Sequence, residues 1–89
     1  PNYAIYCSNL GVFYNQRGEY QLAESLLLQA KNIQEKVFGK AHLDYATVCN
    51  NLARVYDNLG KSESAEALYL EAMQVVEKKM GKNTRLEFY

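Results

Sequence analysis

The chain has 89 residues, a length that allows one domain with one modest core. Ten Lys and Arg residues balance ten Asp and Glu residues, so there is no basic excess to neutralise nucleic-acid phosphates or anionic lipids. No apolar run approaches the roughly 20 residues that cross a bilayer, and no basic-then-apolar leader opens the chain. These features argue against nucleic acid and membranes as partners.

The only cysteines are Cys7 and Cys49, and each lies in an apolar stretch without Cys or His at metal-ligand spacing. We therefore expect no zinc site and no other cofactor. A disulfide or redox pair is the alternative to two small buried thiols, the interpretation we favour because free Cys is among the most buried residue types. Two reduced thiols fit a reducing compartment, and we expect a cytoplasmic location.

The sequence repeats itself after 42 residues. Between Tyr3 and Lys40, sixteen of thirty-eight positions are identical to the residue 42 positions later, without a gap, which chance would not supply. The pairs include Tyr3 and Tyr45, Cys7 and Cys49, Leu10 and Leu52, Tyr14 and Tyr56, Gly18 and Gly60, Ala23 and Ala65, and Ala30 and Ala72. We expect repeat 1 to cover about residues 1–42 and repeat 2 about 43–82, with 83–89 as a partial linker or the start of a cut third repeat.

Each unit predicts two helices. The first begins after an N-cap candidate, Asn2 in one unit and Asp44 in the other, and ends at Gly18 or Gly60, where glycine adopts the left-handed conformation at little cost. Its apolar residues follow the i, i+3, i+4, i+7 spacing of a helix. They are Cys7, Leu10, Gly11 and Tyr14 in the first unit and Cys49, Leu52, Ala53 and Tyr56 in the second.

The second helix follows within two or three residues, with Ser62 as the better N-cap candidate, and ends at Gly39 or Gly81. Its apolar positions are Ala23, Leu26, Leu27, Ala30, Ile33 and Val37 in one unit and Ala65, Leu68, Tyr69, Ala72, Val75 and Val76 in the other. Gly11 or Ala53, facing small residues on this helix, lets the two axes approach at the short end of about 8–10 Å. An all-α stack of two helix-turn-helix repeats follows.

The pattern Cys7-x-x-Leu10-Gly11-x-x-Tyr14, Gly18, Ala23, Leu27, Ala30 and its copy from Cys49 to Ala72 resemble the tetratricopeptide repeat. The 42-residue period and the run Gly39–Asp44 are similar to the longer repeats of the kinesin light chain type, although Leu43 stands where that type usually has Pro. This resemblance implies a right-handed α-α superhelix, or solenoid, that acts as a scaffold for protein partners. It covers nearly the whole chain.

The resemblance also implies that the first helices line a concave groove for an extended or helical segment of a partner. Asn9 and Asn51 can pair with a bound backbone whatever its sequence, although an exposed Asn on a helix is usually solvated. Arg54 suits a carboxylate but can equally be a solvated charge. Ile5, Val12 and Thr47 do not supply the Lys and Arg clamp of chaperone-type members. The groove positions that we predict to bind the partner are Ser8, Asn9, Val12, Asn15, Asn50, Asn51, Arg54 and Asn58.

Two repeats have few neighbours to stabilise them, since about three repeats and polar caps are normally needed. Replacing Lys31 and Gln34 by Met73 and Val76 gives the last helix an apolar end face. Its members are Tyr69, Met73, Val76 and Met80. At the other end, the first helix is crowded with Tyr3, Tyr6, Phe13 and Tyr14. In isolation we expect these two end faces to pair with another copy as a homodimer, and a structural or self-association unit is therefore the alternative function.

Nothing in the sequence indicates an enzyme. His42 is the only histidine and has no Ser, Cys or acid placed to work with it, so we interpret it as a capping or solvated residue. No phosphate-binding Gly-rich loop, paired-acid motif or nucleophile elbow is present. We predict no catalytic residue.

Overall fold

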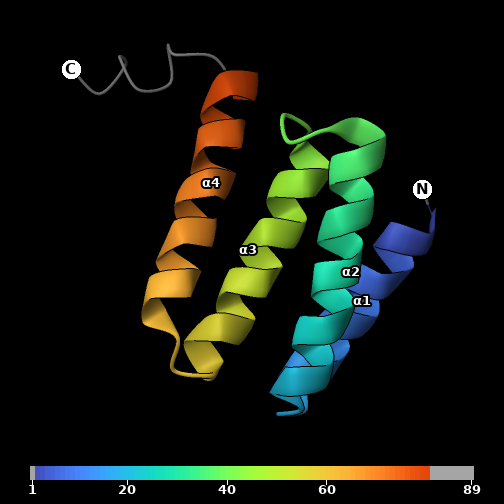
Figure 1. Ribbon diagram of the computed structural model, residues 1–89, viewed down its shortest axis with the longest axis vertical. Coiled ribbons are helices and arrows are strands. Elements are labelled where there is room, and N and C mark those ends of the chain that lie inside the picture. Colours follow the sequence, from blue (N-terminus) through green and yellow to red (C-terminus); the bar gives the residue numbers. More distant parts are fainter. Residues whose placement is uncertain (1, 81–89) are drawn as a thin grey trace.

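The computed structural model describes residues 2–80, and the side chains of residues 3–79, as an all-α structure. Its helices are α1 (Asn2–Gln16), α2 (Tyr20–Phe38), α3 (Leu43–Asn58) and α4 (Ser62–Met80). α1 and α2 form one hairpin, α3 and α4 form a second, and α3 lies between α2 and α4 (Figure 1). The predicted fold class is confirmed in its all-α character and helical repeats, while the handedness of a superhelix remains a prediction.

Glycines end the two first helices in the same way. Gly18 and Gly60 have φ angles of 84° and 81°, the left-handed region that only glycine adopts without strain. The amide of Glu19 donates to the carbonyl of Tyr14 at 2.9 Å, and the amide of Lys61 donates to that of Tyr56 at 2.8 Å. These bonds satisfy the last carbonyls of α1 and α3 as a Schellman motif does, so the turn predicted at each glycine is confirmed.

The core has two parts. The first cluster joins the two hairpins and contains Cys7 of α1 together with buried side chains of α2 and α3. Its buried members are Cys7, Ala23, Leu27, Ala30, Val48, Leu52 and Val55. The second cluster lies between α3 and α4 and contains Tyr45, Ala46, Cys49, Ala72 and Val75. Both cysteines are buried free thiols, as predicted.

Tyr45, a member of the second cluster, contacts both α2 and α4. Its ring is fully buried, its Oη donates to Glu71 Oε2 at 2.6 Å, and Lys31 Nζ lies 5.5 Å from the ring centroid. One aromatic residue of α3 therefore contacts a cation from α2 and an acid from α4. Burial, and next the hydrogen bond to Glu71, raise the pKa of Tyr45 far above its usual range.

Three of the predicted apolar positions are exposed instead: Leu10, Val37 and, at 42%, Val76. Leu10 is 38% exposed, although its counterpart Leu52 is 1% exposed, because α3 packs between α2 and α4, whereas α1 packs mainly against α2 and makes only a small contact with α3. Val37 is 55% exposed because α2, at 19 residues, is four residues longer than α1, at 15, and its last turn extends beyond the hairpin. The polar Gln34 is buried in the face that α2 turns toward α3, a position that the apolar pattern does not include.

The predicted cap of α3 was wrong by two residues. The helix begins at Leu43, so Asp44 lies in its first turn, and its amide donates to His42 Nδ1 at 3.0 Å. His42 is thus the N-cap, and its ring also lies against Phe38, with centroids 4.6 Å apart. Ser62 is the first residue of α4 rather than a residue preceding it.

Four expectations fall outside what the structure describes. The cap predicted at Asn2 depends on a side chain that is not described, and the same holds for the place of Met80 in the end face. Gly81, predicted to end the last helix, and the linker or third repeat predicted at 83–89 lie beyond the described residues.

Candidate functional site

The first helices of the two hairpins meet along a seam of polar side chains. Asn51 Nδ2 of α3 donates to Ser8 Oγ of α1 at 3.4 Å. About two turns further along the same helices, Asn58 Nδ2 donates to Asn15 Oδ1 at 2.9 Å. Ser8 is buried, so its hydroxyl faces α3 and not the solvent. The structure therefore brings four of the eight predicted groove residues together as two pairs that hold α1 against α3.

Other groove residues stay open to solvent beside this seam. Asn9 and Arg54 are exposed, Val12 is half-buried, and within residues 3–79 neither Asn9 nor Arg54 has a side-chain hydrogen bond or ion pair. Arg54 lies near Tyr69, whose Oη donates to Asp57 Oδ2 at 3.3 Å. Burial and the Asp57 carboxylate raise the pKa of Tyr69, and the positive charge of Arg54 opposes them. The α1/α3 face thus combines amides, one apolar side chain and one cation.

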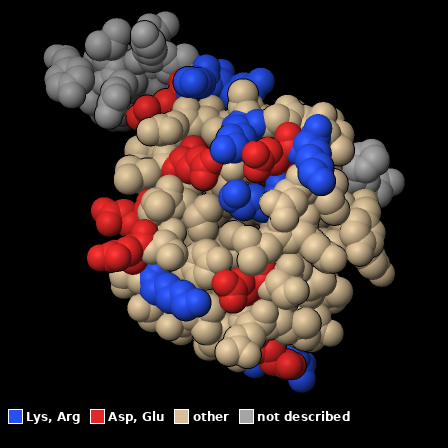
Figure 2. Space-filling view, viewed as in Figure 1, with Lys and Arg blue, Asp and Glu red and all other residues tan. Residues whose placement is uncertain are grey.

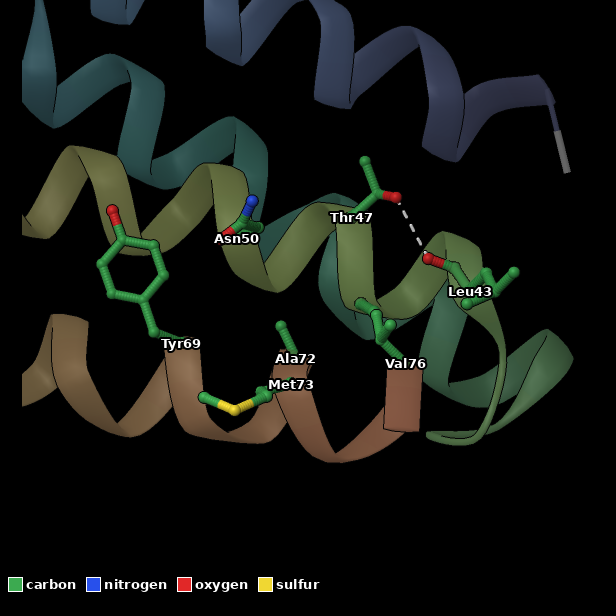
Figure 3. Close-up of a pocket in the computed structure, with 8 residues that line it drawn as sticks. Leu43, Thr47, Asn50, Tyr69, Ala72, Met73 and Val76 are labelled. Atoms are coloured by element: carbon green, nitrogen blue, oxygen red, sulfur yellow. Dashed lines mark hydrogen bonds between the residues drawn. The ribbon is translucent and has the colours of Figure 1, made fainter. Parts of the chain in front are cut away.

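A groove of about 500 Å³ lies between α3 and α4. It is lined by Leu43, Ala46, Thr47, Asn50, Tyr69, Ala72, Met73 and Val76, and none of these residues is charged. In Figure 3, Tyr69, Ala72 and Val76 rise from α4 toward α3, and Thr47 Oγ1 donates to the carbonyl of Leu43 at 3.1 Å. Asn50 from the predicted partner groove and Tyr69, Met73 and Val76 from the predicted end face therefore share one cavity.

Sequence reasoning missed part of this groove. Ala46 and Ala72 are indistinguishable by sequence from core residues, and both are indeed largely buried. In the sequence, Leu43 is distinguished only by standing where the resembled repeats usually have Pro. The available signal is the period itself, because each groove residue except Leu43 has a counterpart 42 positions earlier among the described residues.

Figure 2 shows Lys and Arg interspersed with Asp and Glu, and on this face neither sign gathers into a large patch. Across residues 2–80 no helix is long and apolar enough to span a membrane. The same residues contain no group of three or more His, Cys, Asp or Glu side chains placed to hold a metal ion.

The groups that often act as nucleophiles or bases are used structurally. Burial, followed by the nearby Glu71 charge, raises the pKa of the Cys49 thiol to about 11, so the thiolate is scarce at neutral pH. The Nδ1 atom of His42 accepts the Asp44 amide and is occupied as a helix cap.

Comparison with known families identifies the repeat. The family model described as "Tetratricopeptide repeat" matches residues 3–78, which is most of the chain. No curated protein matches the sequence. Tetratricopeptide repeats are generally modules of protein–protein interaction and non-enzymatic scaffolds, whereas the kinesin light chain type of repeat stays a prediction. With two helical hairpins, a seam between their first helices and this match, the chain belongs to the tetratricopeptide repeat family.

Proposed function

We propose that the chain holds a segment of a partner protein along the α1/α3 face, in contact with Asn9, Asn51 and Arg54. The observation that carries the proposal is the seam, in which Asn51 is already ordered by its bond to Ser8 at 3.4 Å. An ordered side chain loses little further rotamer freedom when a ligand arrives, which favours binding.

The amides suit a polypeptide backbone. An Asn side chain offers two N–H donors and an acceptor oxygen. Asn51 uses one donor on Ser8 and retains its second N–H and its Oδ1 for a bound chain, and the exposed Asn9 occupies the equivalent place on α1. Neighbouring Asn side chains can therefore form hydrogen bonds with the main-chain N–H and C=O groups of a bound segment, whatever its side chains are.

Arg54 supplies the selectivity. Its guanidinium is exposed, has no ion pair among the described residues and presents the planar fork that binds a carboxylate through two hydrogen bonds. Val12, at the equivalent position of α1, is apolar. We infer that the preferred segment carries an acidic residue near Arg54 and an apolar residue near Val12.

The proposal is tested with a phage-displayed library of random peptides, selected against the 89-residue chain. Peptides that bind should be enriched in Asp or Glu, and the double substitution Asn51→Ala, Arg54→Ala should weaken their binding at least about tenfold, measured by calorimetry. The matched control is Asn32→Ala, which removes an exposed amide from α2 and should leave the dissociation constant unchanged.

Backbone amide shifts in NMR place the site independently. A peptide bound as proposed should shift signals from residues 8–16 and 50–58. Equal affinity for the double variant and the unaltered chain, or shifts confined to α2, would contradict the proposal.

A further inference from the structure

The two first helices present the same face to different surroundings. On α3, Val48 and Val55 are 3% and 0% exposed because they pack into the core cluster with α2. Their counterparts on α1, 42 positions earlier, are Tyr6 and Phe13, which are 71% and 48% exposed. α1 therefore carries, uncovered and aromatic, the face that α3 buries.

The second helices differ in the complementary way. The groove residues Asn50, Tyr69, Ala72 and Val76 correspond to Ser8, Leu27, Ala30 and Gln34 of the first hairpin. All four of these counterparts are buried, and α3 is the helix that packs on the first hairpin at this face. The groove between α3 and α4 is thus equivalent to a surface of the α1/α2 hairpin. That surface is covered by α3, the first helix of the next hairpin.

We propose that this groove binds α1 of a second copy of the chain. In this arrangement α1 of one copy lies on the α3/α4 hairpin of another as α3 lies on the α1/α2 hairpin within each copy. The proposal shares Asn9 of α1 with the partner site above, but it is argued from the α3/α4 groove and the exposed Tyr6 and Phe13, and it does not depend on that site.

Polar groups along this contact remain matched. Within the chain Asn51 donates to Ser8, and the corresponding pair between copies is Asn9 with Asn50, two amides that can bond to each other. The bond from Asn58 to Asn15 has as its counterpart Gln16 with Asp57, an amide donor facing a carboxylate.

Apolar and aromatic groups also correspond. Lys31 lies over the ring of Tyr45 within the chain, and between copies Met73 would meet the ring of Tyr3, a favourable sulfur–aromatic contact. Val76 replaces the buried Gln34 and Met73 replaces Lys31, so the groove is less polar than its first example. Its volume of about 500 Å³ leaves space for the larger Tyr6 and Phe13 side chains.

This contact joins two unlike surfaces. Each copy has one groove and one exposed α1 face, so association leaves a groove free at one end and an α1 face free at the other. A symmetric dimer, in which the same α4 face meets itself, would use the groove on both copies. The two arrangements respond differently when single faces are blocked.

The test uses two variants of the full 89-residue chain. The groove variant carries Met73→Glu and Val76→Glu, and the α1 variant carries Tyr6→Glu and Phe13→Glu. All four positions are at least 42% exposed, so the charges should leave the hairpins folded, as circular dichroism would confirm. Analytical ultracentrifugation over a concentration series should show association of the unaltered chain, and each variant alone should associate at least about a hundredfold more weakly because a carboxylate enters the contact.

Mixing the two variants is the decisive measurement. Each mixture retains one intact groove and one intact α1 face, so a one-to-one heterodimer should form and stop at two copies. Leu70→Glu and Ile5→Glu are the matched controls, since their counterparts Leu28 and Thr47 are exposed in the structure. Both controls should associate like the unaltered chain. A chain that stays monomeric up to about 1 mM, or a mixture of variants that fails to form the heterodimer, would overturn the proposal.

Discussion

Gly11 lies where α1 and α2 of the first hairpin approach each other closely. A Cβ atom at this position would lie 2.7 Å from Leu27 Cγ and 3.3 Å from the carbonyl oxygen of Ala23. Leu27 is fully buried between α1 and α3, which leaves it little space to move aside. The second hairpin has Ala53 and Tyr69 in place of Gly11 and Leu27, so it accommodates a methyl group at the position where the first hairpin has glycine.

We predict that Gly11→Ala lowers the free energy of unfolding. Overpacking costs about 1–3 kcal/mol, and replacing Gly by Ala in a helix returns about 1 kcal/mol, so a net loss of roughly 1 kcal/mol is expected in urea denaturation. Adding Leu27→Ala removes the clash, and the double variant should lose less than the sum of the two single losses. An increase in stability for Gly11→Ala would show that Leu27 can be displaced freely.

Single residues also show what a sequence pattern can reveal. Positive φ at Gly18 and Gly60 was predictable, because a glycine that ends an apolar stripe implies this conformation. The burial of Gln34, with its Oε1 lacking a hydrogen-bond partner, was not, since periodicity assigns polar residues to the surface. Leu10 and Leu52 are the same residue in the same register, and only the presence of a neighbouring helix decides their exposure.

At the scale of the element, α3 depends on a histidine cap. Both N-cap preferences, Asp at 44 and His at 42, are compatible with the sequence, and the structure selects His42 because the helix begins at Leu43. Sequence patterns locate a helix better than they locate its first residue.

His42→Ala should therefore destabilise the chain. The Asp44 amide loses its acceptor, His42 Nδ1 at 3.0 Å, and the free energy of unfolding should fall by about 0.5–2 kcal/mol. Thermal or urea denaturation measures this change. His42→Asn restores an acceptor without the ring that lies against Phe38, and it should recover at least half of the loss. If alanine and asparagine proved equally destabilising, the ring contact and not the cap would be the main contribution.

At the scale of the whole molecule, the contact between hairpins was the part that sequence could not supply. The 42-residue period predicted that two hairpins exist, and their helices lie where the pattern placed them. The period does not predict which helix faces meet. The residues of the α2/α3 contact have their counterparts on α4 and α1, and these two helices do not pack against each other. The placement of Tyr45 between Lys31 and Glu71 could be learned only from the structure.

Buried acidic protons make the folded state sensitive to alkali. Burial is the main cause that raises the pKa of Cys49 from 9.0 to about 11 and that of Tyr56 from 10.0 to about 12, and it raises the pKa of Tyr45 as well. These groups bind protons more tightly when the chain is folded, so the unfolded chain loses its protons first as the pH rises. Their contribution to stability is complete below about pH 9 and is lost as the pH passes through the folded-state values.

We predict that the free energy of unfolding falls steadily between pH 9 and pH 11, measured by urea denaturation at closely spaced pH values. Cys49→Ala removes one of the titrating groups, and its stability should decline less steeply in this interval than that of the unaltered chain. Parallel curves for the two chains would show that Cys49 takes no part in the alkaline response.

The seam between α1 and α3 has one further consequence. Both of its hydrogen bonds join residues 43 positions apart, although the repeat period is 42. Successive first helices thus contact each other through neighbouring positions that are not equivalent in the repeat. The position of Ser8 and Asn50 contacts the following first helix, and the position of Asn9 and Asn51 contacts the preceding one. In any series of such hairpins, one side chain would determine the contact with the following hairpin and the next side chain the contact with the preceding hairpin. Substitutions could therefore change one of the two contacts without changing the other.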